Sequence, residues 1–146
     1  MDFSGYLLAA AGRADEAQPI LSELFDTGTA DLSSICESST DCVLAAEMLG
    51  RPAEAWQWLG TRRDSPWFVA ARALADREFV AAAELLDSMG AARSAALARL
   101  RAAQELGRTG RRTEADDQLQ PALDFFRSVD ATRFIREAEA QLAAPA

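Results

Sequence analysis

Arginine and glutamine side chains on one stretch of the chain have the types and the spacing to bind a carboxylate. Arg101, Gln104 and Arg108 stand at positions i, i+3 and i+7, and Arg93 lies two turns earlier, so on a helix the four share one face. Guanidinium groups bind carboxylates through paired hydrogen bonds. This face predicts a basic clamp for a carboxylate-bearing peptide or an acidic helix. The alternative is that these are ordinary surface arginines paired with neighbours such as Glu105.

Tryptophans form the second group of candidate binding residues. Trp56 and Trp58 are two residues apart, so on a helix they point about 200° apart and cannot enter the same core face. A helix with neighbours on two sides would bury both rings. Otherwise one of them, or Trp67, is exposed and is a candidate interface residue, because tryptophan is enriched among binding hot spots. A different interpretation is that the three rings and Phe68 line an apolar pocket for a small molecule.

Several kinds of catalysis lack their usual side chains. The chain contains no His, no Lys and no Asn, which removes histidine acid–base chemistry, Schiff-base lysines, the P-loop lysine, histidine metal ligands and N-glycosylation. Cys36 and Cys42 are six residues apart, too far for a CxxC redox motif, and we expect reduced thiols that are buried or half-buried. We therefore expect no enzyme, no cofactor and no metal site.

The net charge of −8 belongs to the N-terminal part of the chain. Residues 1–60 carry ten acids against two arginines, whereas residues 61–146 carry thirteen of each. An acidic segment repels phosphate backbones, so nucleic acid is a poor partner and a basic protein surface is a better one. The simpler alternative is that the acids keep the protein soluble. The asymmetry also suggests self-association between the acidic half and the arginine-bearing helix.

Length and hydropathy indicate a single soluble domain over 1–146. About half of the 146 residues are apolar, enough for a sizeable core. The apolar run from Tyr6 to Ala11 is far shorter than the ~20 residues that a bilayer requires, and Asp2 stands where a secretory signal would be basic. We expect a cytoplasmic protein that does not contact the membrane.

Apolar residues recur at helical spacing, and no segment alternates like a strand, so the expected fold class is all-α. Ser65 followed by Pro66 is a typical helix start and predicts a helix over 67–75. Asp130 is placed to cap the final helix. Pro121 predicts a kink or break in the helix before it. Further helices are expected over 3–11, 14–25, 52–60 and 78–89, and one more runs from about Asp31 or Ser33 to Leu49. Two others are recognised by their apolar residues: one turns Leu97, Leu100 and Ala103 to the core, and the next carries an apolar stripe from Ala115 to Val129.

Four turns of the chain can be superposed on one another. They begin at Gly12, Gly50, Asp76 and Gly110, which are 38, 26 and 34 residues apart, and the last interval equals the tetratricopeptide period. Each turn ends at a small residue that is followed four positions later by leucine: Ala17 and Leu21, Ala55 and Leu59, Ala81 and Leu85, Ala115 and Leu119. The pattern predicts a right-handed αα-hairpin solenoid of about four hairpins with a C-terminal capping helix. The alternative is a helical bundle without repeats.

A narrower resemblance covers two segments near the C-terminus. Residues 106–115 (LGRTGRRTEA) and 122–140 resemble the end of the repeat region in large bacterial signalling proteins. Those proteins join an adenylate/guanylate cyclase domain or a LuxR-type DNA-binding domain to a signal-transduction ATPase and then to such repeats. Their pattern has Gly where this chain has Asp130. The resemblance implies a sensory or oligomerisation role and carries no catalytic residue onto this chain.

Together these features predict a non-enzymatic protein-interaction scaffold, a regulatory or sensory part of a bacterial signalling system. Both a fragment of a larger regulator and a free-standing protein fit this prediction. The alternative function is a helical sensor that binds a small molecule in the aromatic pocket. We expect a protein or peptide partner, or a second copy of the chain. The candidate partner-binding residues are Arg93, Arg101, Gln104, Arg108, Trp56, Trp58 and Trp67.

Overall fold

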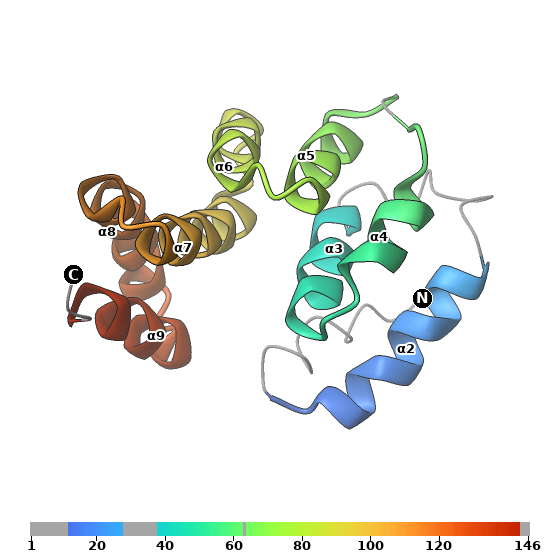
Figure 1. The fold of residues 1–146 in the computed structure, drawn as a ribbon, viewed down its shortest axis with the longest axis horizontal. Helices are drawn as coiled ribbons and strands as arrows, with labels where there is room; N and C mark the ends of the chain where they lie inside the picture. The colour runs from blue at the N-terminus through green and yellow to red at the C-terminus, as the bar shows by residue number, and fades with distance from the viewer. Residues whose placement is uncertain (1–11, 28–37, 63, 144–146) are drawn as a thin grey trace. The chain divides into compact units, whose positions relative to one another are not determined.

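The structure, a computed structural model, describes residues 12–27, 38–62 and 64–143, and every regular element in those ranges is an α-helix (Figure 1). The expected all-α class is therefore confirmed for the described residues. The helix expected over 3–11 and the caps expected at Asp31 and Ser33 lie outside them. The helices are α2 (Ala14–Thr27), α3 (Ser39–Met48), α4 (Pro52–Leu59), α5 (Pro66–Ala75), α6 (Phe79–Ser88), α7 (Ala92–Arg108), α8 (Arg112–Ser128) and α9 (Thr132–Ala143).

The chain divides into two compact units, Met1–Arg77 and Glu78–Ala146. In the first unit, α3 packs against α4 and α5, α4 packs against α5, and α2 contacts α3 and α4. In the second unit, α6 packs against α7, α7 against α8, and α8 against α9, which also contacts α7. No helix in the described ranges combines the length and the apolar composition needed to span a bilayer.

Three-residue turns join several of these helices, and the middle residue of each such turn has a positive φ angle. Gly50, Gly90 and Gly110 take this position with φ near +75°, as expected for a residue without a Cβ. The turn at Gly50 shows how the helix end is closed: the N–H of Gly50 donates to the carbonyl of Glu47 at 3.2 Å, and the N–H of Arg51 donates to the carbonyl of Ala46 at 2.7 Å. This is a Schellman motif, which satisfies carbonyls that the end of a helix leaves free.

Asp130 takes the same left-handed position, with φ of +53°. Its N–H donates to the carbonyl of Arg127, and the N–H of Ala131 donates to the carbonyl of Phe126 at 2.9 Å. Asp130 thus closes the end of α8, and the prediction that it caps the start of α9 is wrong. Aspartate is one of the few residue types that enter this conformation routinely, which explains how it can replace a glycine here.

The turn between α5 and α6 corrects the alignment of the repeats. Its left-handed residue is Arg77, with φ of +62°, and not the preceding Asp76. The repeat register therefore moves by one residue. The buried small residue and leucine of this repeat are Ala82 and Leu86, both fully buried, in place of Ala81 and Leu85. In the other repeats the expected positions are confirmed as buried: Ala17, Leu21, Ala55, Leu59, Ala115 and Leu119.

An arginine follows each of three turn glycines, Gly12, Gly50 and Gly110. Each of these arginines pairs with the carboxylate of a glutamate three residues further along the chain. The Arg51 guanidinium donates to both Glu54 oxygens, at 2.7 and 2.5 Å, and the same two-fold contact joins Arg111 to Glu114 and Arg13 to Glu16. The arginine hydrogen bond holds the pKa of the Glu54 carboxyl below its usual value. Each pair places a carboxylate in the first turn of its helix, where the helix dipole favours negative charge.

The structure bears on two expectations about α8. The helix continues from Arg112 to Ser128, so of the kink or break predicted at Pro121 the break does not occur, and the kink stays a prediction. Because Pro121 has no N–H, the carbonyl of Asp117 lacks the hydrogen-bond donor that it would usually have in a helix. Both residues are exposed, so water can reach that carbonyl. Val129, expected in the buried stripe, is 54% exposed because α8 ends one residue before it. In the same unit Leu97, Leu100, Ala103, Phe126 and Ala138 are buried as expected. Phe134 and Ile135, also expected to close the core, are half-buried, and Leu142 is 36% exposed.

Candidate interaction surfaces

Trp56 on α4 is exposed but held in one orientation. The ring is 47% exposed, and its Nε1–H donates to Asp76 Oδ1 at 2.8 Å. The guanidinium carbon of Arg72 lies 4.1 Å from the ring centroid, within the range of a cation–π contact. Both contacts come from α5 and the turn that follows it. The indole therefore presents part of its surface to solvent from a position that two neighbours fix.

Arg72 also closes the end of α4. Its Nη1 donates to the carbonyl of Gly60 at 2.8 Å and to that of Trp56 at 3.3 Å, and its Nε lies 3.4 Å from Asp76 Oδ2. The last carbonyls of a helix carry partial negative charge, which a guanidinium stabilises. We did not identify Arg72 from the sequence. One signal was present, since Arg72 is the single charged residue in α5, PWFVAARALA.

The other aromatic candidates belong mainly to the core. Trp58 is 6% exposed, and its ring centroid lies 5.8 Å from that of Phe25 on α2. Phe68 is fully buried and Trp67 is half-buried. Trp56 and Trp58 therefore point apart as their spacing predicted, and the alternative in which both are buried does not occur. A small-molecule pocket built from all four rings is poorly supported, because Trp58 and Phe68 offer a ligand almost no surface.

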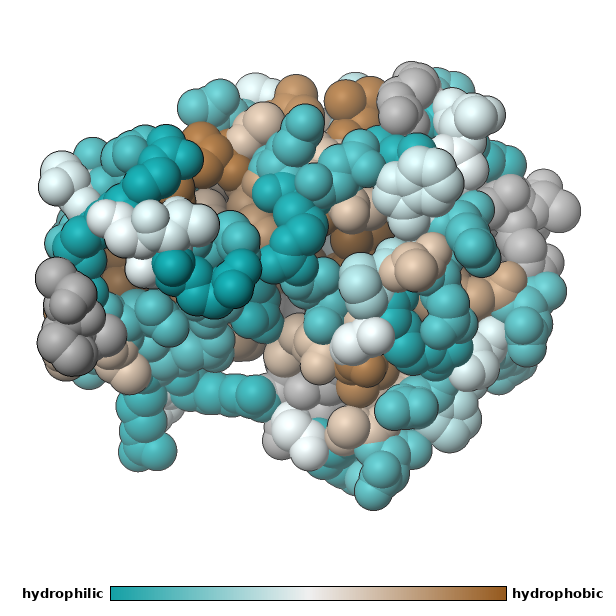
Figure 2. Space-filling view, viewed as in Figure 1, coloured by the Kyte–Doolittle hydropathy of each residue, from teal (hydrophilic) through white to brown (hydrophobic). Residues whose placement is uncertain are grey.

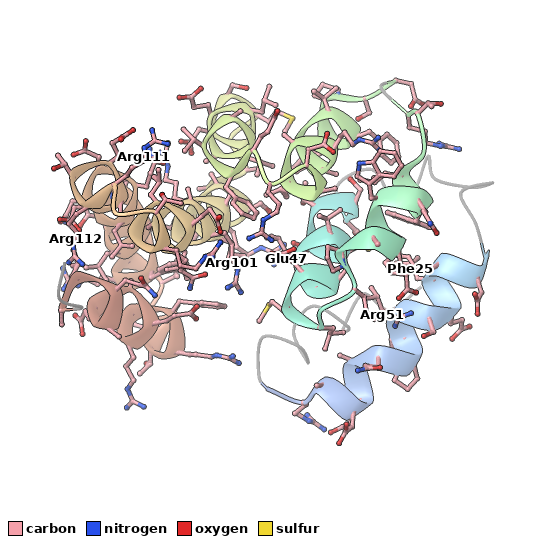
Figure 3. The ribbon with its side chains drawn as sticks, in the orientation of Figure 1. Phe25, Glu47, Arg51, Arg101, Arg111 and Arg112 are labelled. Carbon is pink, nitrogen blue, oxygen red and sulfur yellow. The ribbon has the colours of Figure 1, made fainter. Side chains whose placement is uncertain are left out.

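Arg51 joins α2 to the start of α4. Figure 3 labels Phe25 on α2 and Arg51 at the start of α4, and the guanidinium carbon lies 5.7 Å from the Phe25 ring centroid. Arg51 Nη1 also donates to Ser22 Oγ at 3.0 Å and to the carbonyl of Gln18 at 3.3 Å. These bonds connect the start of α4, the helix that carries Trp56, to α2.

The residues of the predicted clamp lie on α7, and two of them contact α9. Arg101 Nη1 donates to Gln104 Oε1 at 2.8 Å, and Gln104 Nε2 donates to Glu137 Oε1 at 2.7 Å. Arg101 lies 3.8 Å from the same Glu137 oxygen. Arg108 pairs with Glu105 on its own helix at 2.9 Å, and Arg93 is exposed near the start of α7. Arg101 and Gln104 thus contact a carboxylate of this chain, that of Glu137. That the clamp binds a partner protein stays a prediction.

Of the two cysteines, Cys42 lies in a described helix, α3, and is buried as expected, whereas Cys36 lies outside the described residues. Burial, with a smaller contribution from the Asp41 carboxylate, raises the pKa of the Cys42 thiol from 9.0 to about 12. The thiolate is the reactive form, so a raised pKa makes a thiol inert.

We therefore expect Cys42 to react with a disulfide reagent about a thousand-fold more slowly at pH 8 in the folded protein than in urea, from the difference in thiolate fraction. The measurement uses a Cys36→Ser variant, so that Cys42 alone is read. Because the folded pKa is the higher one, this thiol contributes stability below pH 9 that is lost as the pH rises toward 12. Equal reaction rates in buffer and in urea would contradict the buried thiol.

Large hydrophobic side chains are seldom exposed in the part of the chain that the structure describes. On the face seen in Figure 2, hydrophilic residues cover much of each unit and hydrophobic residues show in small separate areas. Among the described residues, the large hydrophobic side chains that are exposed are Trp56, Val129 and Leu142. Trp56 is the member of this set in the first unit, whereas the other two belong to the second.

The described residues thus define an all-α protein whose helices are joined largely by three-residue turns with a left-handed middle residue. No family model, curated protein or solved structure matches this chain. The tetratricopeptide-like arrangement and the resemblance to bacterial signalling repeats therefore stay predictions.

Proposed function

We propose that this chain is a non-enzymatic protein-interaction module and that Trp56 anchors a basic segment of a partner protein. One observation carries the proposal: a tryptophan that is 47% exposed is held in place by Arg72 and Asp76. A side chain that is already fixed loses little conformational entropy on binding. Tryptophan is also one of the residue types enriched among interface hot spots.

Charge favours a basic partner for this unit. Residues 1–77 carry twelve acids against six arginines. Exposed carboxylates on α2 include Asp15 and Glu23, and the exposed Glu16 and Glu54 pair with Arg13 and Arg51. The negative electrostatic potential of this unit attracts a basic segment and repels nucleic acid. The Trp56 ring can then receive an arginine or lysine side chain on its open surface, because aromatic faces attract cations.

The succession of short helices and left-handed turns supports a tetratricopeptide-like solenoid, which we propose as the architecture of the module. Arrays of helix pairs present extended surfaces to other proteins. On the resemblance of residues 106–115 and 122–140, we propose a regulatory or sensory role in a bacterial signalling system. The small-molecule alternative has less support, since two of its four rings are buried in the core.

Selection of displayed random peptides against the full chain tests the proposal. We expect the selected peptides to be rich in arginine and lysine and to bind Trp56→Ala about thirty-fold more weakly than the unmodified protein, the usual loss at a tryptophan hot spot. Val129→Ala is the matched control, because it removes an exposed apolar side chain from the other unit and should leave binding unchanged. Circular dichroism checks that both variants are folded. Acidic selected peptides, or equal affinity for Trp56→Ala, would overturn the proposal.

A further inference from the structure

We propose that α9 is an exchangeable segment, and that two copies of this chain associate by placing the α9 of each on α7 and α8 of the other. The partner is thus a second copy of the same chain. This inference concerns the second unit and does not depend on the role of Trp56 in the first.

Specific side-chain contacts from α7 and α8 recognise α9. Glu137 accepts a hydrogen bond from Gln104 at 2.7 Å, and Glu139 pairs with Arg127 at 2.9 Å. The aromatic ring of Phe134 stacks on Phe126 with centroids 5.1 Å apart. Arg112, labelled in Figure 3, donates to the carbonyl of Leu142. A second copy carries the same α9, so it can make every one of these contacts on the same surface.

Little apolar surface fixes α9 to its own unit. Nine residues of α7 and five of α8 are buried, whereas α9 buries Ala138 alone. Phe134 and Ile135 are half-buried, and the remaining contacts of α9 are polar and partly exposed. Elements with few buried apolar contacts open most readily, so α9 can leave α7 and α8 without unfolding them.

The turn before α9 is strained in the arrangement within one copy. Asp130 holds φ of +53°, a conformation that aspartate enters more readily than most residues with a Cβ but that still costs more energy than a helical one. If residues 129–131 become helical, α8 continues into α9, the strain is released, and α9 is carried away from its own α7. It can then pack on a second copy, and short hinges under strain favour such exchange.

Two substitutions of Asp130 change the hinge in opposite directions. Alanine disfavours the left-handed turn and favours a continuous helix, whereas glycine accepts the turn without cost. Because two hinges change in each dimer, we expect Asp130→Ala to tighten dimerisation about thirty-fold and Asp130→Gly to weaken it by a similar factor. Sedimentation equilibrium after refolding at several concentrations measures the constants. The same dimerisation constant in both variants would overturn the proposal.

Charge reversal distinguishes exchange from any other dimer. One chain carries Arg101→Glu and Arg127→Glu, and the other carries Glu137→Arg and Glu139→Arg. Within either chain the contacts of α9 become repulsive, but in an exchanged mixed dimer every pair is attractive again. We expect mixed dimers to exceed both homodimers at least ten-fold when the two chains are refolded together, which native mass spectrometry resolves.

A third chain controls for general attraction between oppositely altered charges. It carries Glu84→Arg and Asp117→Arg, which alter exposed residues of α6 and α8 by the same total charge. Refolded with the Arg101→Glu, Arg127→Glu chain, it should form no excess of mixed dimer. Equal mixed-dimer yields with this control chain, or a statistical mixture in the main experiment, would show that α9 stays on its own unit.

Discussion

Replacing Phe126 with alanine is expected to lower the free energy of unfolding of the second unit by about 3–5 kcal/mol. The Phe126 ring is fully buried, stacks on Phe134 of α9, and makes an edge contact with Phe125 at a centroid distance of 6.0 Å. Its removal leaves a cavity between α8 and α9 and withdraws the ring on which α9 rests. Urea unfolding of the full chain, followed by far-ultraviolet circular dichroism, measures the loss.

The neighbouring Phe125 provides the matched control. It is half-buried on the same helix, so Phe125→Ala removes the same group with less lost burial, and we expect at most about half the effect. A second consequence separates the two variants. Without the stacked ring, the amide hydrogens of α9 should exchange faster than in the unmodified protein in Phe126→Ala, and by a clearly smaller factor in Phe125→Ala. Equal losses in both variants would show that the core of this unit does not centre on Phe126.

Much of the helical framework could be predicted because it depends on local patterns. The buried positions Leu97, Leu100 and Leu119 follow from the 3.6-residue period, and they are confirmed. Ser65 is also confirmed as a cap, since its hydroxyl accepts a hydrogen bond from the N–H of Trp67. These features need only neighbouring residues, so the sequence contains all the information.

The turns show where local reasoning fails. A glycine marks a left-handed turn, but Arg77 and Asp130 adopt the same conformation without that signal. At the first, the missing glycine led to an alignment that is one residue out of register. At the second, aspartate is common both as a helix cap and in left-handed turns, and its type alone does not distinguish the two.

The candidate sites were harder to predict because their partners are distant in sequence. The divergence of Trp56 and Trp58 follows from a helical spacing of two residues. The contact of Trp56 with Asp76 spans twenty residues, and that of Gln104 with Glu137 spans thirty-three. No periodicity relates such positions. They meet because α5 packs on α4 and α9 packs on α7, which only the three-dimensional structure shows.

Replacing Arg72 with methionine is expected to destabilise the first unit by about 2–4 kcal/mol. Methionine keeps much of the volume of the aliphatic stem but removes the hydrogen bonds to the carbonyls of Gly60 and Trp56 and the cation over the Trp56 ring. The side chain of Arg72 is only 13% exposed, so water replaces these interactions poorly. Urea unfolding measures the loss, and Trp56 should become more solvent-exposed, with a red shift in the folded-state tryptophan emission.

Two further substitutions separate the contributions. Arg72→Lys retains the positive charge but has one nitrogen in place of a planar fork, so it can support one carbonyl and should recover part of the lost stability. Arg13→Met breaks an exposed pair with Glu16 and should change the unfolding midpoint far less. If Arg72→Met costs no more than Arg13→Met, the guanidinium does not hold α4 against α5. Trp56 would then lack the rigid support on which its role as an anchor depends.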